Sequence, residues 1–577
     1  MLEICANFLG KNEMKSTQEI KTDVLVIGGG AAGCWAALTA SMRGVDVTLI
    51  NKYPLGKSGT TIVGMITYNA VMGELGVHPE DSPDIYFQDL VKEGALLGDQ
   101  DLMEIFVRRG RETVLQLEKM GVRWDKVGNK FDARRLPGMS YPRGCFSDHR
   151  TGLFIQRALV REIQKRSNIR VLERKVTKLL TKDGQIVGAV GLHIHDGSFL
   201  KVMAKSVVIA TGGAGRLFKI TSMPEDARGD GYSLAYEAGA KLIDMEFHLF
   251  FPATLVYPET LRGLVVPRGT TVPLGARILN GRRERFMHKY YPEAELTTRD
   301  KASISIFKEI KSGAVTPHGG VYMDVSSVEN LLEKYPTSFK DFKDAGMNLP
   351  DEWLEIAPGL HFTLGGVQIN GFCEASLPGL YAAGEAAGNM HGANRIGGSA
   401  LPECSVFGQI AGENAAIRTQ FIQPLEADRK EVQEERERLR SLLDAGKNGH
   451  IRPVKIMRTL QELMYDKVGV LRTGNSLRGA ITEIRELKKK TKDMKIHSSE
   501  RYNNEWIDAI DIQNMLHLGE IAAQCALARE ESRGAHYRED FPQQNDRSWK
   551  KHSLSWKEGG DIRIAYHPVT VTRPEEE

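Results

Sequence analysis

The chain has 577 residues, of which 41% are hydrophobic and 26% charged, and its formal net charge is +3. This composition is typical of a globular protein with several domains, and the nearly balanced charge gives no indication of a nucleic-acid partner. No run of about 18 apolar residues occurs, so we expect no transmembrane segment, and residues 1–19 lack the apolar core of a signal peptide. The predicted location is cytoplasmic, either free or peripheral to the inner face of a membrane within a complex.

The first predicted element is a strand over 22–27, followed by the turn Gly28-x-Gly30-x-x-Gly33 and a helix through 36–40. A second strand follows at 45–50. Gly28 allows the chain to reverse, Gly30 lets backbone N–H groups approach a phosphate, and Gly33 lets the helix pack against the strand. The pattern predicts a site for a dinucleotide pyrophosphate. The alternative is a glycine turn that only joins two core elements.

The second strand ends in Asn51 and Lys52, where many dinucleotide enzymes carry an acid for the ribose. Asn51 retains a group that can hydrogen-bond a ribose hydroxyl. The loop at 56–61 contains Ser58 and Thr60 among glycines, a composition suited to facing a phosphate or a flavin. We therefore place this loop beside the predicted dinucleotide.

Further elements follow in order. Residues 99–120 have helical periodicity, and 170–172, 185–190 and 207–210 are β-like. The last strand leads into a second glycine turn at 211–215, and a helix is expected over 232–240.

The pattern then changes. Residues 246–355 are rich in proline, aromatic and charged residues and do not continue the alternation of strands and helices, which indicates an inserted domain. The strand-and-glycine pattern returns at 380–385, and helices predicted at 431–443, 454–470, 477–491 and 507–529 form a bundle. We expect an α/β fold with a dinucleotide domain in two parts, 1–245 and 356–425. The insertion is 246–355, and a helical domain with a tail occupies 426–577.

The six cysteines are scattered and form no C-x-x-C motif, so the chain lacks a recognisable zinc or iron–sulfur site of its own. We expect no metal site.

Several motifs carry a resemblance over roughly 20–570. They are the glycine turn, Arg150-Thr151-Gly152, Ala210-Thr211-Gly212-Gly213, Gly229-Asp230-Gly231, Asp244-Met245-Glu246-Phe247, Arg299-Asp300, 361–366, 382–398 and 532–540. With these motifs in this order, the chain resembles the flavoprotein subunits of succinate dehydrogenase and fumarate reductase, a family that includes L-aspartate oxidase. The resemblance implies a Rossmann-like FAD-binding domain interrupted by an α+β capping domain and followed by a C-terminal helical domain.

The resemblance also implies how FAD is bound. The expected cofactor-binding residues are Gly28, Gly30, Ala32, Gly33, Asn51, Lys52, Ser58, Thr60, Thr211, Gly212, Asp230, Glu385, Arg395, Ala400 and Leu401. Respiratory members attach FAD through a histidine in a Ser-His-Thr stretch, whereas this chain has Ser58-Gly59-Thr60. We therefore predict FAD that is not covalently bound.

Family chemistry is hydride transfer between the flavin and a carbon–carbon bond beside a carboxylate, which requires cations for the carboxylate and a proton donor at the carbon. By resemblance, Arg299 supplies the proton, and His361 and Arg395 hold one carboxylate. The structural alternatives are a salt bridge of Arg299 and Asp300 at a helix start, and a packed core histidine at 361.

The other half of the substrate site departs from the family. Phe251-Pro252-Ala253 stands where the family has His-Pro-Thr, and the next segment reads Pro267-Arg268-Gly269. We therefore expect a small carboxylate substrate that is not a simple C4 dicarboxylate, with an apolar remainder near Phe250 and Phe251. Arg268 is a candidate replacement cation, and His248 a candidate replacement imidazole.

The predicted function is that of the flavoprotein subunit of a fumarate reductase-like oxidoreductase that exchanges electrons with an iron–sulfur partner subunit. Two alternatives remain open. One is an adenylylsulfate reductase-like or L-aspartate oxidase-like flavoenzyme, and the other is a non-catalytic subunit that relays electrons through FAD.

Overall fold

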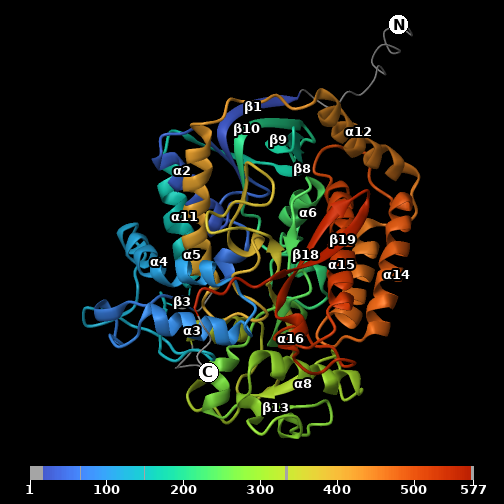
Figure 1. Ribbon diagram of the computed structural model, residues 1–577. Helices are drawn as coiled ribbons and strands as arrows, with labels where there is room; N and C mark the ends of the chain where they lie inside the picture. The colour runs from blue at the N-terminus through green and yellow to red at the C-terminus, as the bar shows by residue number, and fades with distance from the viewer. Residues whose placement is uncertain (1–16, 65–66, 149, 332–335, 574–577) are drawn as a thin grey trace.

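The computed structural model describes residues 17–64, 67–148, 150–331 and 336–573 (Figure 1). Its main sheet has the strand order β7-β2-β1-β10-β9-β8, with β17 paired to β10. The bounds are β1 (Gln18–Ile27), β2 (Val47–Asn51), β7 (Ile169–Glu173), β8 (Lys175–Lys182), β9 (Gln185–Leu192), β10 (Phe199–Ile209) and β17 (Leu380–Ala382). The strands expected at 22–27, 45–50, 170–172, 185–190 and 207–210 are confirmed.

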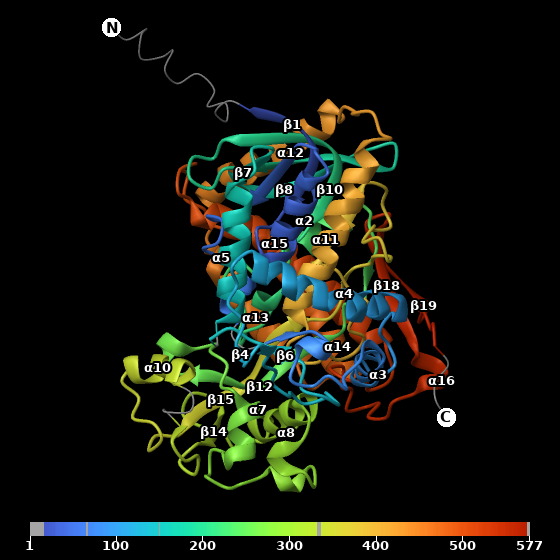
Figure 2. The same cartoon turned by 90° about the vertical axis from the view of Figure 1, so that its left-hand side faces the viewer.

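Parallel pairing joins β7, β2, β1, β10 and β17, whereas β9 and β8 pair antiparallel at one side. Parallel strands are usually buried on both faces, and Val24, Leu25 and Val26 of β1 are fully buried here. Three helices run beside this sheet: α2 (Ala31–Met42), α5 (Thr151–Gln164) and α11 (Ala400–Thr419) (Figure 2). The sheet therefore presents the carboxyl ends of β1 and β10, with their glycine turns, to one edge.

Further helices are α3 (Pro83–Glu93), α4 (Gln100–Lys119) and α6 (Asp230–Glu237), so the helix expected over 99–120 is confirmed. Four short strands form two small ladders: β3 (Tyr68–Asn69) with β6 (Gly144–Cys145), and β4 (Lys126–Val127) with β5 (Lys130–Phe131).

A separate sheet occupies the segment predicted as the insertion. Its order is β12-β15-β14-β13, with bounds β12 (His248–Tyr257), β13 (Arg277–Leu279), β14 (Val321–Asp324) and β15 (Leu354–Thr363). In the described ranges the helices that accompany it are α7 (Arg268–Thr271), α8 (Arg299–Lys311) and α10 (Pro336–Asp344). A hydrophobic cluster of its own, from Phe251 to Ile356, fills this part, which lies at the bottom of Figure 1. The exact domain boundaries stay predictions.

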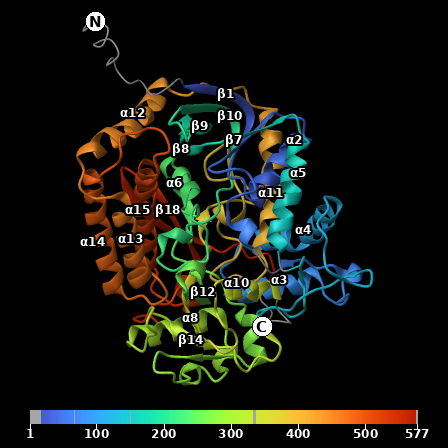
Figure 3. The ribbon, with the colours of Figure 1, turned by 180° about the vertical axis from the view of Figure 1, so that it is seen from behind.

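The C-terminal helices are α12 (Arg429–Ala445), α13 (Pro453–Leu463), α14 (Gly474–Lys490) and α15 (Asn504–Ala528), and Figure 3 shows them along one flank of the molecule. The four predicted helices are thus confirmed, and the end of the one expected over 454–470 is a π-helical turn at Met464–Val468. Within the described ranges, no helix combines the length and the apolar character needed to cross a bilayer.

The chain after α15 is not helical throughout, which corrects the expectation for 426–577. The short helix α16 (Asp546–Trp549) precedes a hairpin of β18 (Lys551–Glu558) and β19 (Asp561–Pro568). This hairpin joins β11 (Leu242–Ile243) and β16 (Gly366–Val367) in a four-stranded sheet. Leu554 and Trp556 of β18 and Ile562, Ile564 and Tyr566 of β19 occupy alternate positions on either side of a Gly-Gly turn, so the sequence does carry a hairpin signal, which sequence reasoning missed.

Candidate active site

The glycine turn after β1 requires glycine at two positions. Gly28 has φ +111°, and a Cβ there would lie 2.2 Å from the Ala210 carbonyl oxygen. A Cβ at Gly33 would lie 1.8 Å from the carbonyl oxygen of Gly28. Gly30 precedes the first residue of α2 and offers no side-chain cap, and Thr61 Oγ1 accepts the Ala31 N–H at 3.0 Å. The turn therefore places the N-terminus of α2 at the sheet edge, as an anion site requires.

Room for a ligand lies beside the second glycine turn. Gly212 has φ +74°, and a Cβ there would meet no atom within 4 Å. Two oxygens nearby, Thr211 Oγ1 and Asp230 Oδ1, are buried without a hydrogen-bond partner among the described residues. Since buried polar atoms are normally paired, these two fit the hydroxyl groups of a bound dinucleotide.

Three of the predicted cofactor-binding residues also make internal contacts. Asn51 Oδ1 accepts the Gly29 N–H at 2.8 Å, so Asn51 holds the glycine turn in place. Lys52 Nζ lies 2.8 Å from Asp511 Oδ2 of α15 and 3.6 Å from Asp230 Oδ2. The ribose and phosphate contacts expected of Asn51, Lys52, Ser58 and Asp230 stay predictions.

Glu385 follows β17 and is buried, with Oε1 accepting the Thr363 N–H at 2.9 Å. Burial raises the pKa of Glu385 to about 8, because the charged form loses its hydration. The carboxyl also lies so close to Gly213 that a Cβ there would be 2.1 Å from Oε1. Glu385 thus lies between the glycine turn and β15.

A cavity of about 990 Å³ lies between the sheet edge and the inserted segment. Its lining brings together the three residues predicted to act on the substrate, Arg299, His361 and Arg395, and three predicted flavin neighbours, Thr60, Ala400 and Leu401. Ser58 is not part of the lining. Apolar side chains form much of the remaining wall, including Leu136, Pro137, Leu264 and Val265.

The three residues come from different elements. Arg299 begins α8, His361 lies on β15, and Arg395 lies on the loop before α11. Phe251 of β12 connects two of them, since its ring centroid is 5.4 Å from the His361 ring and 5.4 Å from Arg299 Cζ. The third, Arg395, stacks its Cζ 4.5 Å from the Phe362 ring.

The cavity carries an excess of positive charge. Arg299 and Arg395 form no ion pair with a carboxylate within the described part of the chain, and Arg395 Nε is buried without a hydrogen-bond partner there. Burial and the neighbouring Arg299 lower the pKa of Arg395 to about 10. Burial also lowers the pKa of Arg299, whose place at the N-terminus of α8 further disfavours its positive charge. An anion in the cavity would offset this repulsion.

His361 is neutral in this setting. Its burial is the main cause that lowers the pKa of His361 to about 3, and the positive charges of Arg395 and Arg299 act in the same direction. Its Nδ1 lies 2.8 Å from Ser222 Oγ, so the hydroxyl orients the ring. His361 is therefore neither a packed core histidine nor a cation here, but an oriented hydrogen-bonding group that faces the cavity. The sequence carries no signal for Ser222, which sequence reasoning missed.

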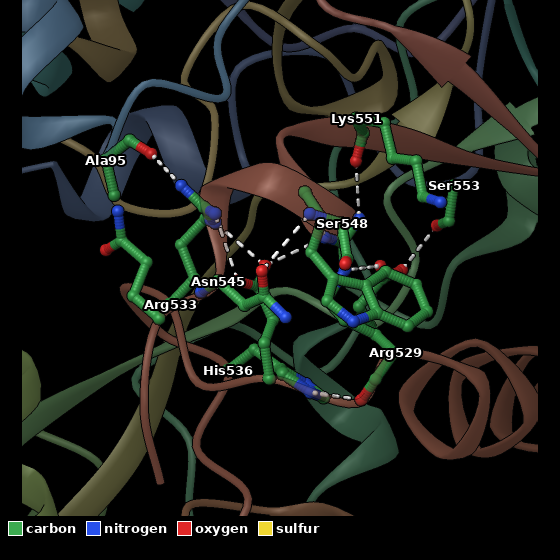
Figure 4. A network of polar contacts seen from close by, with 12 residues as sticks. Ala95, Arg529, Arg533, His536, Asn545, Ser548, Lys551 and Ser553 are labelled. Atoms are coloured by element: carbon green, nitrogen blue, oxygen red, sulfur yellow. Dashed lines mark hydrogen bonds and ion pairs between the residues drawn. The ribbon is translucent and has the colours of Figure 1, made fainter. Parts of the chain in front are cut away.

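The Arg395 loop is held by the motif at 532–540. Ala535 N–H donates to the Ala393 carbonyl at 2.8 Å. Arg533 Nη1 donates to the Ala95 carbonyl at 2.8 Å (Figure 4). Arg529 and Arg533 share the buried carboxylate of Glu531, at 3.0 and 2.8 Å. The C-terminal motif thus has a structural role, which is to fix the loop that carries Arg395.

Two sequence expectations about the substrate wall, for His248 and Phe250, need correction, and the one for Arg268 stays a prediction. His248 is buried against Phe218, with ring centroids 5.0 Å apart, and is not part of the cavity lining. Phe250 packs against Phe218 and Tyr465 instead of lining the cavity. Arg268 does line it, but its Nη2 donates to the carbonyls of Glu295 and Thr297. Arg268 Nε is buried and unpartnered among the described residues and is therefore available to a ligand.

Two family models match successive parts of the chain. The profile described as FAD binding domain matches residues 23–401, and that described as fumarate reductase flavoprotein C-term matches 457–576. A fumarate reductase (CoM/CoB) subunit of Methanothermobacter marburgensis is 37% identical over 535 residues, 92% of this chain and 96% of that protein.

Solved structures give the same result. Sdh1 of Mycobacterium smegmatis superposes with a TM-score of 0.90 at 31% identity, over 96% of each chain. Adenylylsulfate reductase of Archaeoglobus fulgidus has a TM-score of 0.80 at 20% identity, over 97% of this chain and 98% of that chain, which is a likeness of fold alone.

Proposed function

Because the chain belongs to the family of succinate dehydrogenase and fumarate reductase flavoprotein subunits, whose members are FAD-dependent oxidoreductases, we propose that it interconverts a saturated and an α,β-unsaturated carboxylate. The observation that carries the proposal is the convergence of Arg299, Arg395 and neutral His361 on one cavity without a carboxylate partner among the described residues. Bound FAD would donate or accept the hydride.

The roles follow from the chemistry of each group. Arg395 and the oriented imidazole of His361 hold the substrate carboxylate, which gains negative charge when a hydride adds to the double bond. Arg299 donates a proton to the carbon that carries the remaining charge. A buried guanidinium whose pKa is lowered, at the start of a helix, gives up a proton more readily than one in water.

The substrate class follows from the wall around Phe251. Phe251 contacts both His361 and Arg299, and Leu136, Leu264 and Val265 extend the apolar surface. Arg134, Arg135, Arg150 and Arg262 also line the cavity, so the argument applies to the stretch of wall beside Phe251. A second carboxylate buried against the apolar side chains there would cost free energy, whereas an apolar substituent would be stabilised. We therefore propose a monocarboxylate with an apolar remainder in place of a C4 dicarboxylate.

An iron–sulfur partner subunit is the proposed source of electrons. No group of three or more candidate metal ligands occurs in the ranges that the structure covers. The chain then needs a second protein to carry single electrons to the flavin. Co-purification of the native complex, followed by iron analysis, tests this part.

The experiment for the activity uses the FAD-containing protein reduced with dithionite under argon. Crotonate, trans-cinnamate and fumarate are added separately, and flavin reoxidation is followed by absorbance. We expect crotonate or cinnamate to reoxidise the flavin faster than fumarate. Arg299→Ala should slow this reaction by about 10²–10⁴-fold while retaining FAD. Faster reaction with fumarate would contradict the substrate class.

Two outcomes would instead favour the alternatives. Bleaching of the oxidised flavin by sulfite would indicate adenylylsulfate reductase-like chemistry. Electron transfer through the complex that Arg299→Ala leaves unchanged, together with no reaction with any of the three acids, would indicate a relay subunit.

A further inference from the structure

Glu93, the last residue of α3, lies near Arg299 but outside the cavity lining. Arg299 lines the cavity, whereas Glu93 does not. Glu93 is half-buried, and the charges of Arg299 and Asp300 act on its carboxyl without an ion pair between Glu93 and Arg299. A partly exposed carboxyl therefore lies near a guanidinium that lines the cavity.

Asn394 fixes the position of this carboxyl. Its Nδ2 donates to Glu93 Oε1 at 2.9 Å, and its Oδ1 accepts the N–H of Arg395 at 3.0 Å. On the other side, Glu93 Oε2 lies against Gly138, where a Cβ would be 2.7 Å away. The Asn394 amide thus holds Oε1 of Glu93, and the absence of a side chain at Gly138 leaves room for Oε2.

The surroundings of Glu93 favour its protonated form. Burial and the nearby carboxylate of Asp300 raise the pKa of Glu93 to about 7, Arg299 lowers it, Asp89 raises it and Lys92 lowers it. Glu93 also ends α3, where the helix dipole disfavours a negative charge. A carboxyl in these conditions can hold a proton near neutral pH and give it up again.

We propose that Glu93 supplies the proton by which Arg299 is recharged, so that protons enter the site from solvent along the end of α3. This inference rests on the proposed function, in which Arg299 donates a proton to the substrate carbon. In the reductive direction, one N–H bond of Arg299 breaks and a C–H bond forms, leaving a neutral guanidine. The O–H bond of Glu93 then breaks as its proton passes through an intervening water molecule to form a new N–H bond on Arg299, and the Glu93 carboxylate takes a proton from solvent. The two electrons come from reduced flavin.

The alternative is that Glu93 only holds Asn394 and hence the Arg395 loop. Glu93→Gln separates the two roles, because the amide oxygen can still accept the hydrogen bond from Asn394 but the side chain cannot release a proton. Glu93→Asp restores a carboxyl, and Glu74→Gln, an exposed glutamate outside the cavity lining, is the matched control.

The kinetic test uses the FAD-containing protein with reduced methyl viologen as donor and crotonate or fumarate as acceptor. Glu93→Gln should lower kcat by about 10–100-fold, with a much smaller change in KM, and Glu93→Asp should recover part of the rate. The wild-type kcat should fall as pH rises above about 7, and this fall should be absent from Glu93→Gln. Glu74→Gln should behave as wild type.

A second readout needs no substrate. Infrared spectra of the wild-type protein should contain a carboxylic-acid band that is lost around pH 7 and is missing from Glu93→Gln, while the band from Glu385 remains. Identical titrations of the two proteins would overturn the proposal. So would a normal rate in Glu93→Gln when Arg299→Ala is inactive, a result that leaves the proposed function standing. Activity that persists in Arg299→Ala would instead refute the proposed function.

Discussion

The backbone of Gly534 lies directly against the carbonyl group of Ala393. A Cβ built on Gly534 would be 2.3 Å from the Ala393 oxygen, and that same oxygen accepts the Ala535 N–H at 2.8 Å. The C-terminal motif and the loop that carries Arg395 therefore meet backbone to backbone. Nothing larger than glycine fits between them without displacing the loop.

Gly534→Ala should lower the free energy of unfolding by more than the cost of placing an alanine at a positive φ. Gly534 has φ +51° and Gly559, in the β18–β19 turn, has φ +60°, but a Cβ at Gly559 would meet no atom within 4 Å. We expect Gly559→Ala to cost about 1–2 kcal/mol for its conformation and Gly534→Ala about 1–3 kcal/mol more for the clash. Urea unfolding of both variants measures the difference, and equal free energies would show that the loop adapts.

Arg395→Lys should weaken carboxylate binding while retaining the charge. A lysine cannot reproduce the planar, two-pronged geometry of the guanidinium or its stacking on Phe362. We expect the Kd of crotonate, titrated by its effect on the flavin spectrum, to rise by about 10–100-fold. Arg458→Lys, at an exposed position of α13, is the control. An unchanged Kd would mean that the carboxylate binds elsewhere.

Stability should fall with acidification partly because of His248. Burial and Arg472 lower the pKa of His248 to about 3 in the folded protein, below the ordinary value of about 6.5. Between those values the unfolded chain binds a proton that the folded chain does not, so the free energy of unfolding decreases as pH falls from about 6.5 towards 3.

His248→Gln should remove that contribution, which is up to about 1.4 kcal/mol per pH unit. Urea titrations at pH 6.5 and 4.5 compare its slope with that of wild type and of His288→Gln, an exposed histidine. The same slope in all three proteins would mean that His248 is protonated in the folded state.

The flavin should separate from the protein on acid precipitation. Residue 59 is glycine where a covalent attachment would need a histidine, and its φ of +89° is one that side-chain-bearing residues rarely adopt. We expect all flavin absorbance in the supernatant after trichloroacetic acid treatment. Yellow colour in the washed pellet would disprove this.

The elements that could be predicted from the sequence are those with strong local signals. The β1 strand ends in four apolar residues, Gly28 and Gly33 are required by close backbone contacts, and α12 to α15 have clear helical periodicity. The convergence of Arg299, His361 and Arg395 followed from family motifs, since these residues lie on three elements far apart in the chain.

What could not be predicted depends on tertiary contacts. His248 and Phe250 alternate with residues on the other face of β12, and bulges between β12 and β15 shift which side chains face the cavity. Arg268 was identified as a cation, but its carbonyl partners Glu295 and Thr297 are visible only in the fold. Glu93 has no motif, and only its place beside Arg299 indicates a function.

The contact between the Arg395 loop and the motif at 532–540 also bears on how the protein is made. A ribosome synthesises Arg395 well before Arg533 and Gly534, so the nascent chain contains the substrate-binding arginine before the residues that hold its loop. The anion site should therefore form late in synthesis. Early release of the polypeptide, at any point before residue 532, should give a product that keeps the β1 glycine turn but lacks an ordered carboxylate site.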